Sequence, residues 1–383
     1  MHKRLYVWGS GETGQLGLGT EDDYALPQRW ENDQVTELDS VISGGCHSAG
    51  INRDGRLFLW GSDDRGQLGR RVSGQEQNFV NAPREPVAWI PRESKTKLVA
   101  CGWWSTMAVS SESDGDRVLS WGSNGHHQLG RQTEETTTSM QILHLPPRLK
   151  VASIGCGWKH SLLATAEGAV FAWGSGRHGQ LGLGTDTLKT EIPKRVETLK
   201  SATITAVFCG WEHSVFKSSS GDVFTCGNNR HGQLGVRQIS TSEEKRKQVN
   251  ASPLRLGLQA VQVGCGWHFV LCLTEGGELV TWGKGSHGQL GLGGFENASE
   301  PQVVPFPHAI RQIACGSEHS MVATTGGDLY TCGWGEHGNL GHGDKTNRAS
   351  LEKVEFFTST NQEVVSVVAG GAVSIAVTCA RQQ

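Results

Sequence analysis

A short element that ends in Trp-Gly or Cys-Gly recurs seven times along this chain of 383 residues. Its Trp or Cys stands at intervals of 50 to 61 residues, at Trp8, Trp60, Trp121, Trp173, Cys226, Trp282 and Cys332. A Gly-Gln-Leu-Gly-like element follows each copy, at 14–17, 66–69, 127–130, 179–182, 232–235, 288–291 and 338–341. Repeats of this length indicate a solenoid, a propeller or an array, because no single unit of this kind buries its own apolar faces.

The composition agrees with a repeat protein and excludes several other classes. There are 52 glycines at recurring places, about twice the usual share of roughly 7%, so we interpret them as turn and close-approach residues. The net charge of −3 gives no general attraction to nucleic acid or to an anionic membrane. No apolar run reaches the roughly 18 residues that cross a bilayer. Because the first repeat begins a few residues after Met1, we expect no signal peptide.

The ten cysteines follow the repeat and do not form a disulfide pattern. Five occupy one repeat position just before a glycine, Cys101, Cys156, Cys209, Cys265 and Cys315, and two replace the recurrent Trp. Cysteine at such places acts as a small buried apolar residue. No Cys-x-x-Cys pair is present, which excludes a zinc ribbon. We expect a reducing compartment, the cytoplasm with the nucleus as a second location, and no cofactor.

Each repeat reads as four short strands, and no stretch shows convincing helical periodicity, so the predicted class is all-β. The third strands, such as 57–60 and 223–226, are apolar on both faces, as strands covered on both sides are. The chain starts at a third strand (5–8) and ends on a first and a second strand (364–368 and 374–378). Joining the two ends completes a blade and leaves no exposed edge. We therefore predict a single seven-bladed propeller over 1–383, its last blade made from about 1–40 plus 360–383.

Three connections between blades are long, 70–96, 131–149 and 236–253, and we interpret them as solvated loops. Trp89 in the first of them is expected to pack on a blade. The last carries the charged run 243–247.

Two families of histidine recur with the repeat. One belongs to a Gly-x-x-His-Ser element (His47, His160, His213, His319), and the other precedes Gly-Gln-Leu-Gly. Equivalent positions in neighbouring blades should lie about 10 Å apart or more. A zinc ion needs all its ligand atoms within roughly 2.0–2.1 Å of the metal, so equivalent histidines of neighbouring blades cannot share one ion. We therefore predict no metal site and no catalytic residue, and expect each ring nitrogen to tie its strand to loop backbone.

The tryptophans break the symmetry of the repeat. At one position in the seven copies the residues are Gly45, Trp103, Trp158, Trp211, Trp267, Ser317 and Gly371. Four successive blades thus carry Trp and three carry a small residue. This arc of four tryptophans has two interpretations. Either it is a face used for contact with a partner, since aromatic anchors dominate interface energetics, or its rings fill the interior of the propeller. If the contact face exists, Trp104 and His268 belong to it.

These Cys-Gly-Trp-x-His-Ser, Trp-Gly and Gly-Gln-Leu-Gly elements resemble the regulator of chromosome condensation repeat family, whose members are seven-bladed propellers. Residues 316–319 and 332–339 are similar to the last full repeat of a branch of that family. This branch includes a secretion-regulating guanine nucleotide exchange factor of animals and a fungal alpha-tubulin suppressor propeller. The match adds Glu318, His319, Trp334 and Glu336 to the expected partner-binding residues.

The resemblance implies a non-enzymatic accessory factor. Its partner would be a small zinc-binding electron-carrier protein, with which it would serve Elongator-dependent tRNA wobble-uridine modification and diphthamide synthesis, without contacting nucleic acid or membrane itself.

Two alternatives stay open. The first is guanine nucleotide exchange on a small Ran-like or secretory GTPase, although the sequence shows no clear wedge. The second is UV-B sensing by the tryptophans. In the photoreceptor of the family an Arg follows each Trp and packs on it. Here the following residues are Trp104, Lys159, Glu212 and His268, which predicts that this cation–π pairing is absent and argues against light sensing.

Overall fold

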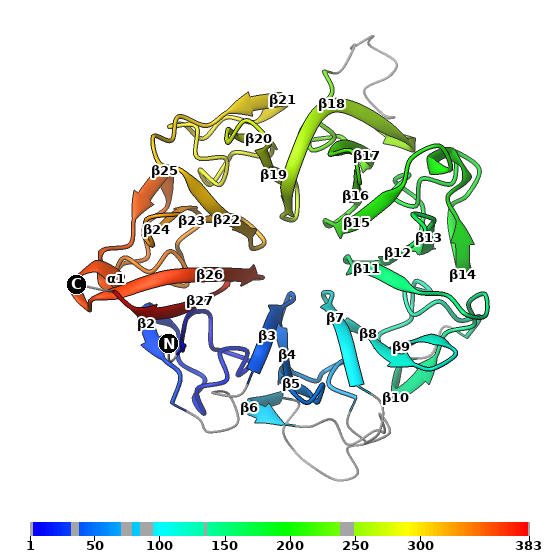
Figure 1. Cartoon of the computed structure of the whole chain (residues 1–383), viewed down its shortest axis with the longest axis horizontal. Helices are drawn as coiled ribbons and strands as arrows, with labels where there is room; N and C mark the ends of the chain where they lie inside the picture. The colour runs from blue at the N-terminus through cyan, green and yellow to red at the C-terminus, as the bar shows by residue number, and fades with distance from the viewer. Residues whose placement is uncertain are drawn as a thin grey trace.

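The strands radiate from a central axis in a ring of blades (Figure 1), as the repeat spacing predicted. The computed structural model describes residues 3–31, 38–69, 79–84, 95–133, 136–237 and 249–381. Within these residues the only helices are a 3-10 turn η1 (Glu197–Leu199) and the short α1 (Glu355–Ser359), so the predicted all-β class is confirmed. Neither helix in this described part is long and apolar enough to cross a membrane.

Blades 1 to 3 are four-stranded antiparallel sheets, each with its first strand nearest the axis. Blade 1 contains β3 (Leu38–Ser43), β4 (His47–Asn52), β5 (Leu57–Ser62) and β6 (Phe79–Arg84). Blade 2 contains β7 (Lys95–Cys101), β8 (Ser105–Glu112), β9 (Gly115–Gly122) and β10 (Thr137–Ile142). Blade 3 contains β11 (Val151–Cys156), β12 (His160–Thr165), β13 (Val170–Ser175) and β14 (Lys189–Arg195).

Blades 4 and 5 share one long strand, β18 (Val249–Cys265). Its first part pairs with β17 as the outer strand of blade 4, up to Gln259 opposite Asp222. From Ala260 onward it pairs with β19 as the inner strand of blade 5. Blade 4 also contains β15 (Ile204–Cys209), β16 (His213–Ser218) and β17 (Asp222–Asn228). Blade 5 also contains β19 (Phe269–Thr274), β20 (Leu279–Gly283) and β21 (Ala298–Val303).

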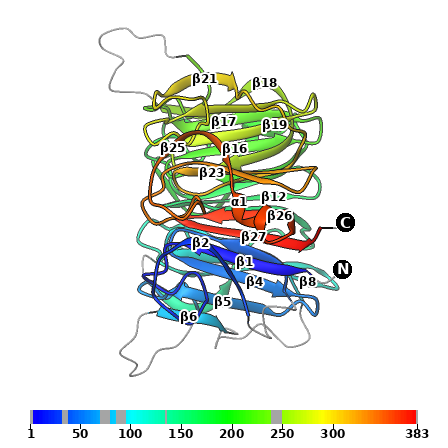
Figure 2. The same ribbon diagram turned by 90° about the vertical axis from the view of Figure 1, so that its left-hand side faces the viewer.

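The two ends of the chain meet in blade 7. Blade 6 contains β22 (Ile310–Cys315), β23 (His319–Thr324), β24 (Leu329–Gly333) and β25 (Arg348–Lys353). Blade 7 contains β26 (Gln362–Gly370), β27 (Val373–Ala380), β1 (Arg4–Gly9) and β2 (Tyr24–Arg29). β1 pairs antiparallel with β27 from Arg4 opposite Thr378 to Gly9 opposite Val373. The predicted closure by two C-terminal and two N-terminal strands is confirmed, and Figure 2 shows these strands side by side.

The predicted long loops contain outer strands, which corrects that part of the sequence interpretation. β6 lies inside 70–96, β10 inside 131–149, and β18 begins inside 236–253. Trp89 and the charged run 243–247 lie outside the described residues. Five outer strands contain a proline, which is typical of sheet edges and hides the strand pattern in the sequence: Pro27, Pro83, Pro193, Pro253 and Pro301.

The recurrent residues join each blade to the next. At the junction of blades 2 and 3 the carbonyl oxygen of Gln128 accepts the indole N–H of Trp173 (2.9 Å) and the hydroxyl of Ser161 (2.8 Å). Equivalent indole bonds reach the same backbone position from Trp8, Trp60, Trp121 and Trp282. In blades 4 and 6 the thiols of Cys226 and Cys332 replace the indole. The residues of the repeat motifs therefore supply the hydrogen bonds that join neighbouring blades.

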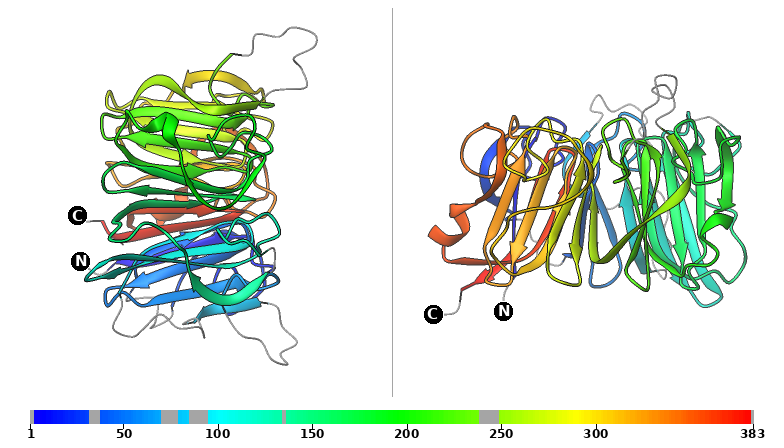
Figure 3. Two further views of the ribbon diagram at one scale, coloured as in Figure 1. Left: turned by 90° about the vertical axis from the view of Figure 1, so that its right-hand side faces the viewer. Right: turned by 90° about the horizontal axis from the view of Figure 1, so that it is seen from above.

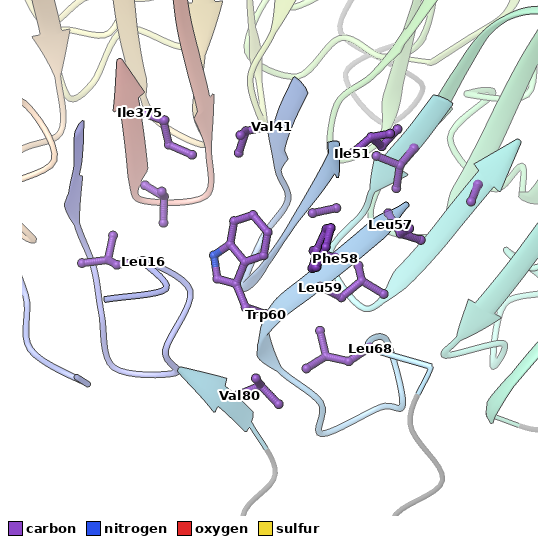
Figure 4. Packing of buried hydrophobic residues seen from close by; sticks show 14 of the residues in the cluster. Leu16, Val41, Ile51, Leu57, Phe58, Leu59, Trp60, Leu68, Val80 and Ile375 are labelled. Atoms are coloured by element: carbon purple, nitrogen blue, oxygen red, sulfur yellow. The ribbon is translucent and has the colours of Figure 1, made fainter. Parts of the chain in front are cut away.

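The core lies between the blades. Figure 4 shows Trp60 of β5 with Leu16, Val80 and Ile375, which come from blade 7 and from the outer strand of blade 1. Trp60 has no exposed surface, and all six residues of β5 are buried. The prediction that third strands are covered on both sides is confirmed here.

Candidate functional site

The corners between first and second strands and the loops between third and fourth strands lie on one face of the disc, because alternate turns of an antiparallel sheet point the same way. Figure 3 shows the disc edge-on, with its loops on two opposite faces. The corners surround the axis, where they line a cavity of about 160 Å³. We call this side the tryptophan face, since its centre holds the corner residues Trp103, Trp158, Trp211 and Trp267.

The four corner indoles form one cluster at the axis. Trp158 and Trp211 stack with ring centroids 4.3 Å apart and an interplanar angle of 30°. Trp211 lies edge-on to Trp267 at 4.6 Å, and Trp103 lies 5.0 Å from Trp267 and 5.5 Å from Trp211. Side chains from four blades thus meet in what we call the tryptophan cluster. Each remains half-buried, so the cluster fills the axis and still offers aromatic surface.

The asymmetry of the tryptophan arc has a packing reason. A Cβ atom on Gly45 would lie 2.2 Å from Trp103 Cε3. The same position holds Ser317 in blade 6 and Gly371 in blade 7. Small residues on three blades therefore leave room at the axis for the indoles of the other four. The interpretation that the rings fill the interior describes this packing, and contact of the same face with a partner stays a prediction.

Two cations lie over rings of the tryptophan face, which corrects the predicted absence of cation–π pairing. The Nζ atom of Lys159 is 3.3 Å from the ring centroid of Trp158. Arg65 lies 5.7 Å from the ring of Trp104, which itself contacts Trp103 at 6.1 Å. Burial lowers the pKa of Lys159, and Glu212 opposes that change. Lys159 was overlooked because only an Arg after the Trp was considered as the stacking cation, although Lys159 follows Trp158 directly. Arg65 was overlooked because it comes from the neighbouring blade.

His268 lies at the edge of the cluster, and its part in a partner contact stays a prediction. Its ring lies 6.1 Å from Trp211 and 5.1 Å from His231. Burial, with nearby positive charges, lowers the pKa of His268 to about 3, so the ring is neutral at pH 7.

Glu318 and His319 lie inside the ring and hold blades together. Glu318 is 4% exposed, bonds to Lys284 Nζ at 2.7 Å and accepts a hydrogen bond from Gln289. His319 has no exposed surface, and its Nε2 lies 2.9 Å from Ser374 Oγ in blade 7. We therefore withdraw both from the partner-contact set that the sequence predicted.

Trp334 and Glu336 form a separate group on the same face. They belong to the loop after the third strand of blade 6, where Trp334 Nε1 donates to Glu336 Oε2 at 3.1 Å. The ring of Trp334 contacts His337 at 5.1 Å and His287 at 6.2 Å. Glu336 is exposed and Trp334 half-buried. These predicted residues remain accessible but contact none of the four cluster indoles.

Two arrangements resemble chemical sites. His213 Nε2 lies 3.2 Å from Cys265 Sγ, but burial raises the pKa of that thiol and lowers the pKa of His213 to about 3, so both stay neutral. Among the described residues, potential metal ligands of Glu12, Asp23 and His337 lie within 4.8 Å of one another. Asp23 already pairs with His337 at 2.9 Å and with the Lys345 ammonium at 3.7 Å.

The family of the chain follows from a match along the whole ring. A family model described as the RCC1-like domain matches residues 4–376, from β1 to β27. The chain belongs to the RCC1-like domain family.

Several curated proteins are similar to this RCC1-like chain. The ultraviolet-B receptor UVR8 of Arabidopsis thaliana is 31% identical over 301 residues, which cover 78% of this chain and 65% of the receptor. The secretion-regulating guanine nucleotide exchange factor of Mus musculus is 32% identical over 296 residues, covering 75% of this chain and 61% of that protein. The chain thus spans less than two thirds of either relative.

Solved structures show the same fold. Human WBSCR16 superposes with a TM-score of 0.85 at 23% identity, covering 99% of this chain and 100% of that one. Prp20p of Saccharomyces cerevisiae, described with its binding to Gsp1p and histones, superposes with a TM-score of 0.83 at 21% identity, covering 100% and 92%. At these identities the likeness shows the propeller alone.

Three arginines of this RCC1-like face were not found from the sequence. Arg65, Arg177 and Arg230 stand in the loops between third and fourth strands, beside a histidine or in its repeat position. Comparing that position from repeat to repeat, as was done for the tryptophans, would have found them.

Proposed function

We propose that this RCC1-like chain is a non-enzymatic protein-binding propeller that holds a small protein partner on its tryptophan face. The observation that supports this is the cluster of four half-buried indoles at the centre of one face, flanked by Lys159. Rigid aromatic side chains supply large contact area at low entropic cost and dominate interface energetics. A shallow aromatic centre surrounded by charged loops suits a protein surface better than a small molecule.

For the partner we propose the small zinc-binding electron-carrier protein. With it, the chain would serve Elongator-dependent tRNA wobble-uridine modification and diphthamide synthesis, in the cytoplasm with the nucleus as a second location. This finer proposal rests on the resemblance of 316–319 and 332–339 to one branch of the family. Trp334 and Glu336 remain exposed enough to add contacts at the rim.

Calorimetric titration of the purified chain with the electron carrier tests the proposal. We expect one-to-one binding in the wild type. Replacing Trp158→Ala and Trp211→Ala together should weaken it by about 2 kcal/mol or more, roughly 30-fold in Kd. The single variant Trp334→Ala on the same face is the matched comparison and should cost less.

The ring should still fold in the double variant, because Gly45, Ser317 and Gly371 show that a corner functions with a small residue. An unchanged Kd would contradict the proposal. A melting temperature that collapses together with binding would instead make the cluster part of the core.

Guanine nucleotide exchange is the second candidate, favoured by the similarity to the mouse exchange factor. If the electron carrier does not bind, release of a fluorescent GDP analogue from a panel of small GTPases decides this candidate. Acceleration that the double tryptophan variant abolishes would support it.

The observed contact of Lys159 with Trp158 removes one argument against UV-B sensing, and the receptor UVR8 is a relative. Sedimentation before and after UV-B illumination tests this third candidate, and an unchanged oligomeric state would eliminate it.

A further inference from the structure

Each blade exposes one residue at the same place on the tryptophan face. It lies in the loop after the third strand, two positions before the Gly-Gln-Leu-Gly-like turn. We call these the tip residues: Glu12, Asp64, Gly125, Arg177, Arg230, Ser286 and Glu336. All seven are exposed, whereas the Gln or Asn of the following turn is buried in every blade.

The turn beneath each tip is fixed by the scaffold. In blade 3 the backbone N–H after the tip donates to Gln180 Oε1 at 3.0 Å, and Gly179 N–H donates to the Gly176 carbonyl at 2.9 Å. Blades 4 and 5 repeat the first bond with Gln233 and Gln289. In blade 3 these bonds use backbone and glutamine atoms and not the Arg177 side chain. The tip carboxylates of Asp64 and Glu336 accept hydrogen bonds from Ser62 Oγ and Trp334 Nε1. The fold therefore fixes the position of each tip residue but does not require that residue to be acidic, basic or neutral.

The charges of the tips are sorted around the ring. Blades 6, 7 and 1 carry the acidic tips Glu336, Glu12 and Asp64, and blades 3 and 4 carry the basic tips Arg177 and Arg230. The tips of blades 2 and 5, between the two groups, are neutral. Figure 1 places blades 3 and 4 across the ring from blades 6 and 7. The tryptophan face thus has an acidic and a basic pole with the cluster between them.

Other charges at the basic pole leave its sign unchanged. Lys159 adds a positive charge there. Burial lowers its pKa, Glu212 opposes that change, and the nearby Arg177 lowers the pKa further. Glu212 lies there too, 3.2 Å from His178 and bonded to Asn228. Neither Arg177 nor Arg230 forms an ion pair within the described residues, so both guanidinium groups remain available.

The acidic pole also keeps its sign. Asp23 adds a negative charge that Lys345 compensates. Arg65 follows Asp64 directly but lies over Trp104. Glu12 and Glu336 carry the pole, because both are exposed and neither is in an ion pair within the described chain.

We propose that these poles select the partner of the tryptophan face and dock it in one orientation. The partner is a protein with two separate patches: an acidic patch lies on Arg177 and Arg230, and a basic patch lies on Glu12 and Glu336. This inference rests on the proposed protein-binding function and adds the charge pattern of the partner. Opposite poles steer the encounter and set its register, while the indoles supply affinity.

Association kinetics with the purified zinc-binding electron carrier test the poles. The variants are Arg177→Glu with Arg230→Glu, and Glu12→Lys with Glu336→Lys. Each pair should lower the association rate constant about tenfold at low ionic strength, with the difference shrinking as salt rises and the dissociation rate little changed. Ser286→Glu and Ser286→Lys, at the same loop position of blade 5, should stay within about twofold.

Two results would overturn the proposal. If reversing one pole slows association and reversing the other speeds it, the partner has a single sign of charge. If the free chain self-associates and either reversal abolishes this in sedimentation, the occupant is a second copy of the chain.

Absence of electron-carrier binding in the wild type would refute the proposed partner but leave the poles testable with labelled octaglutamate and octalysine. Octaglutamate binding should be lost only in the arginine variant and octalysine binding only in the glutamate variant. Any other pattern overturns the poles.

Discussion

A single buried histidine shows how the repeat residues depend on one another. His160 has its Nε2 2.9 Å from Ser214 Oγ in the next blade, and that hydroxyl donates to the Gln180 carbonyl at 2.6 Å. The imidazole must therefore donate from Nε2. A Cβ on Gly157 would lie 2.5 Å from His160 Cε1, so the ring needs that glycine. Our expectation of a scaffold role was right, but the partner is a hydroxyl on the neighbouring blade and not loop backbone.

These buried imidazoles predict loss of stability in mild acid. Burial lowers the pKa of His47, His160 and His213 to about 3 and of His319 to about 4. From the ordinary value of about 6.5 down to those values, the unfolded chain binds protons that the folded chain does not. The free energy of unfolding should therefore decrease as the pH is lowered, by about 1.4 kcal/mol per pH unit for each histidine.

Urea unfolding from about pH 7 to about pH 5 measures this slope. His160→Gln should be less stable than the wild type at neutral pH, yet lose stability less steeply in acid. Identical slopes for the two proteins would refute the assignment of His160 to the acid effect.

At the scale of elements, α1 is a structure that the repeat pattern does not contain. It follows β25 and packs where the two chain ends meet. Phe357 is 1% exposed, and its ring lies 5.6 Å from Tyr6 and 5.9 Å from Trp8, both on β1. One turn of helix near the C-terminus therefore packs on the N-terminal strand of blade 7 and supports the closure.

Phe357→Ala should lower the free energy of unfolding by about 3–5 kcal/mol, because it leaves a cavity in an enclosed aromatic cluster. Phe356→Ala is the matched control, since the half-buried Phe356 contacts the same Tyr6 ring at 5.6 Å. Urea melts of both variants check this, and equal losses would show that α1 does not support closure through Phe357.

At the scale of the whole molecule, ring closure is non-covalent and uses the same strand pairing as every other blade. β1 is the third strand of blade 7 and β27 the second, and their register of six residue pairs resembles the five between β19 and β20. Nothing in that pairing requires the chain ends to lie in blade 7. The same ring could therefore form from a chain whose ends lie in another blade.

A circular permutant opened between Gly276 and Gly277, with the old ends joined by a short flexible linker, should therefore fold. These glycines lie in the exposed turn between β19 and β20, and a Cβ on Gly277 would meet nothing within 4 Å. We expect the circular dichroism spectrum to be retained and a cooperative melt. A permutant opened at the buried Thr281 inside β20 should fail. Failure of both would show that closure needs the chain to be opened in blade 7.

The sequence alone was sufficient to predict the all-β class, the number of blades and the closure of the last blade by two C-terminal and two N-terminal strands. Each of these depends on residues that recur within one unit, such as Trp173 and Gln180, and on the need of each unit to bury its faces against neighbours. The outer strands β6 and β10 were missed because edge strands bury one face only, and β6 also carries a proline.

Only the tertiary structure decided what the candidate site contains. Trp103 meets Trp267 at the axis although 164 positions separate them, and Gly45 makes room for it from a third blade. Glu318 became internal because Lys284 reaches it from the preceding blade. Repeat periodicity specifies neighbours within a blade. What meets at the axis depends on the closed ring, where side chains from all blades compete for one small volume.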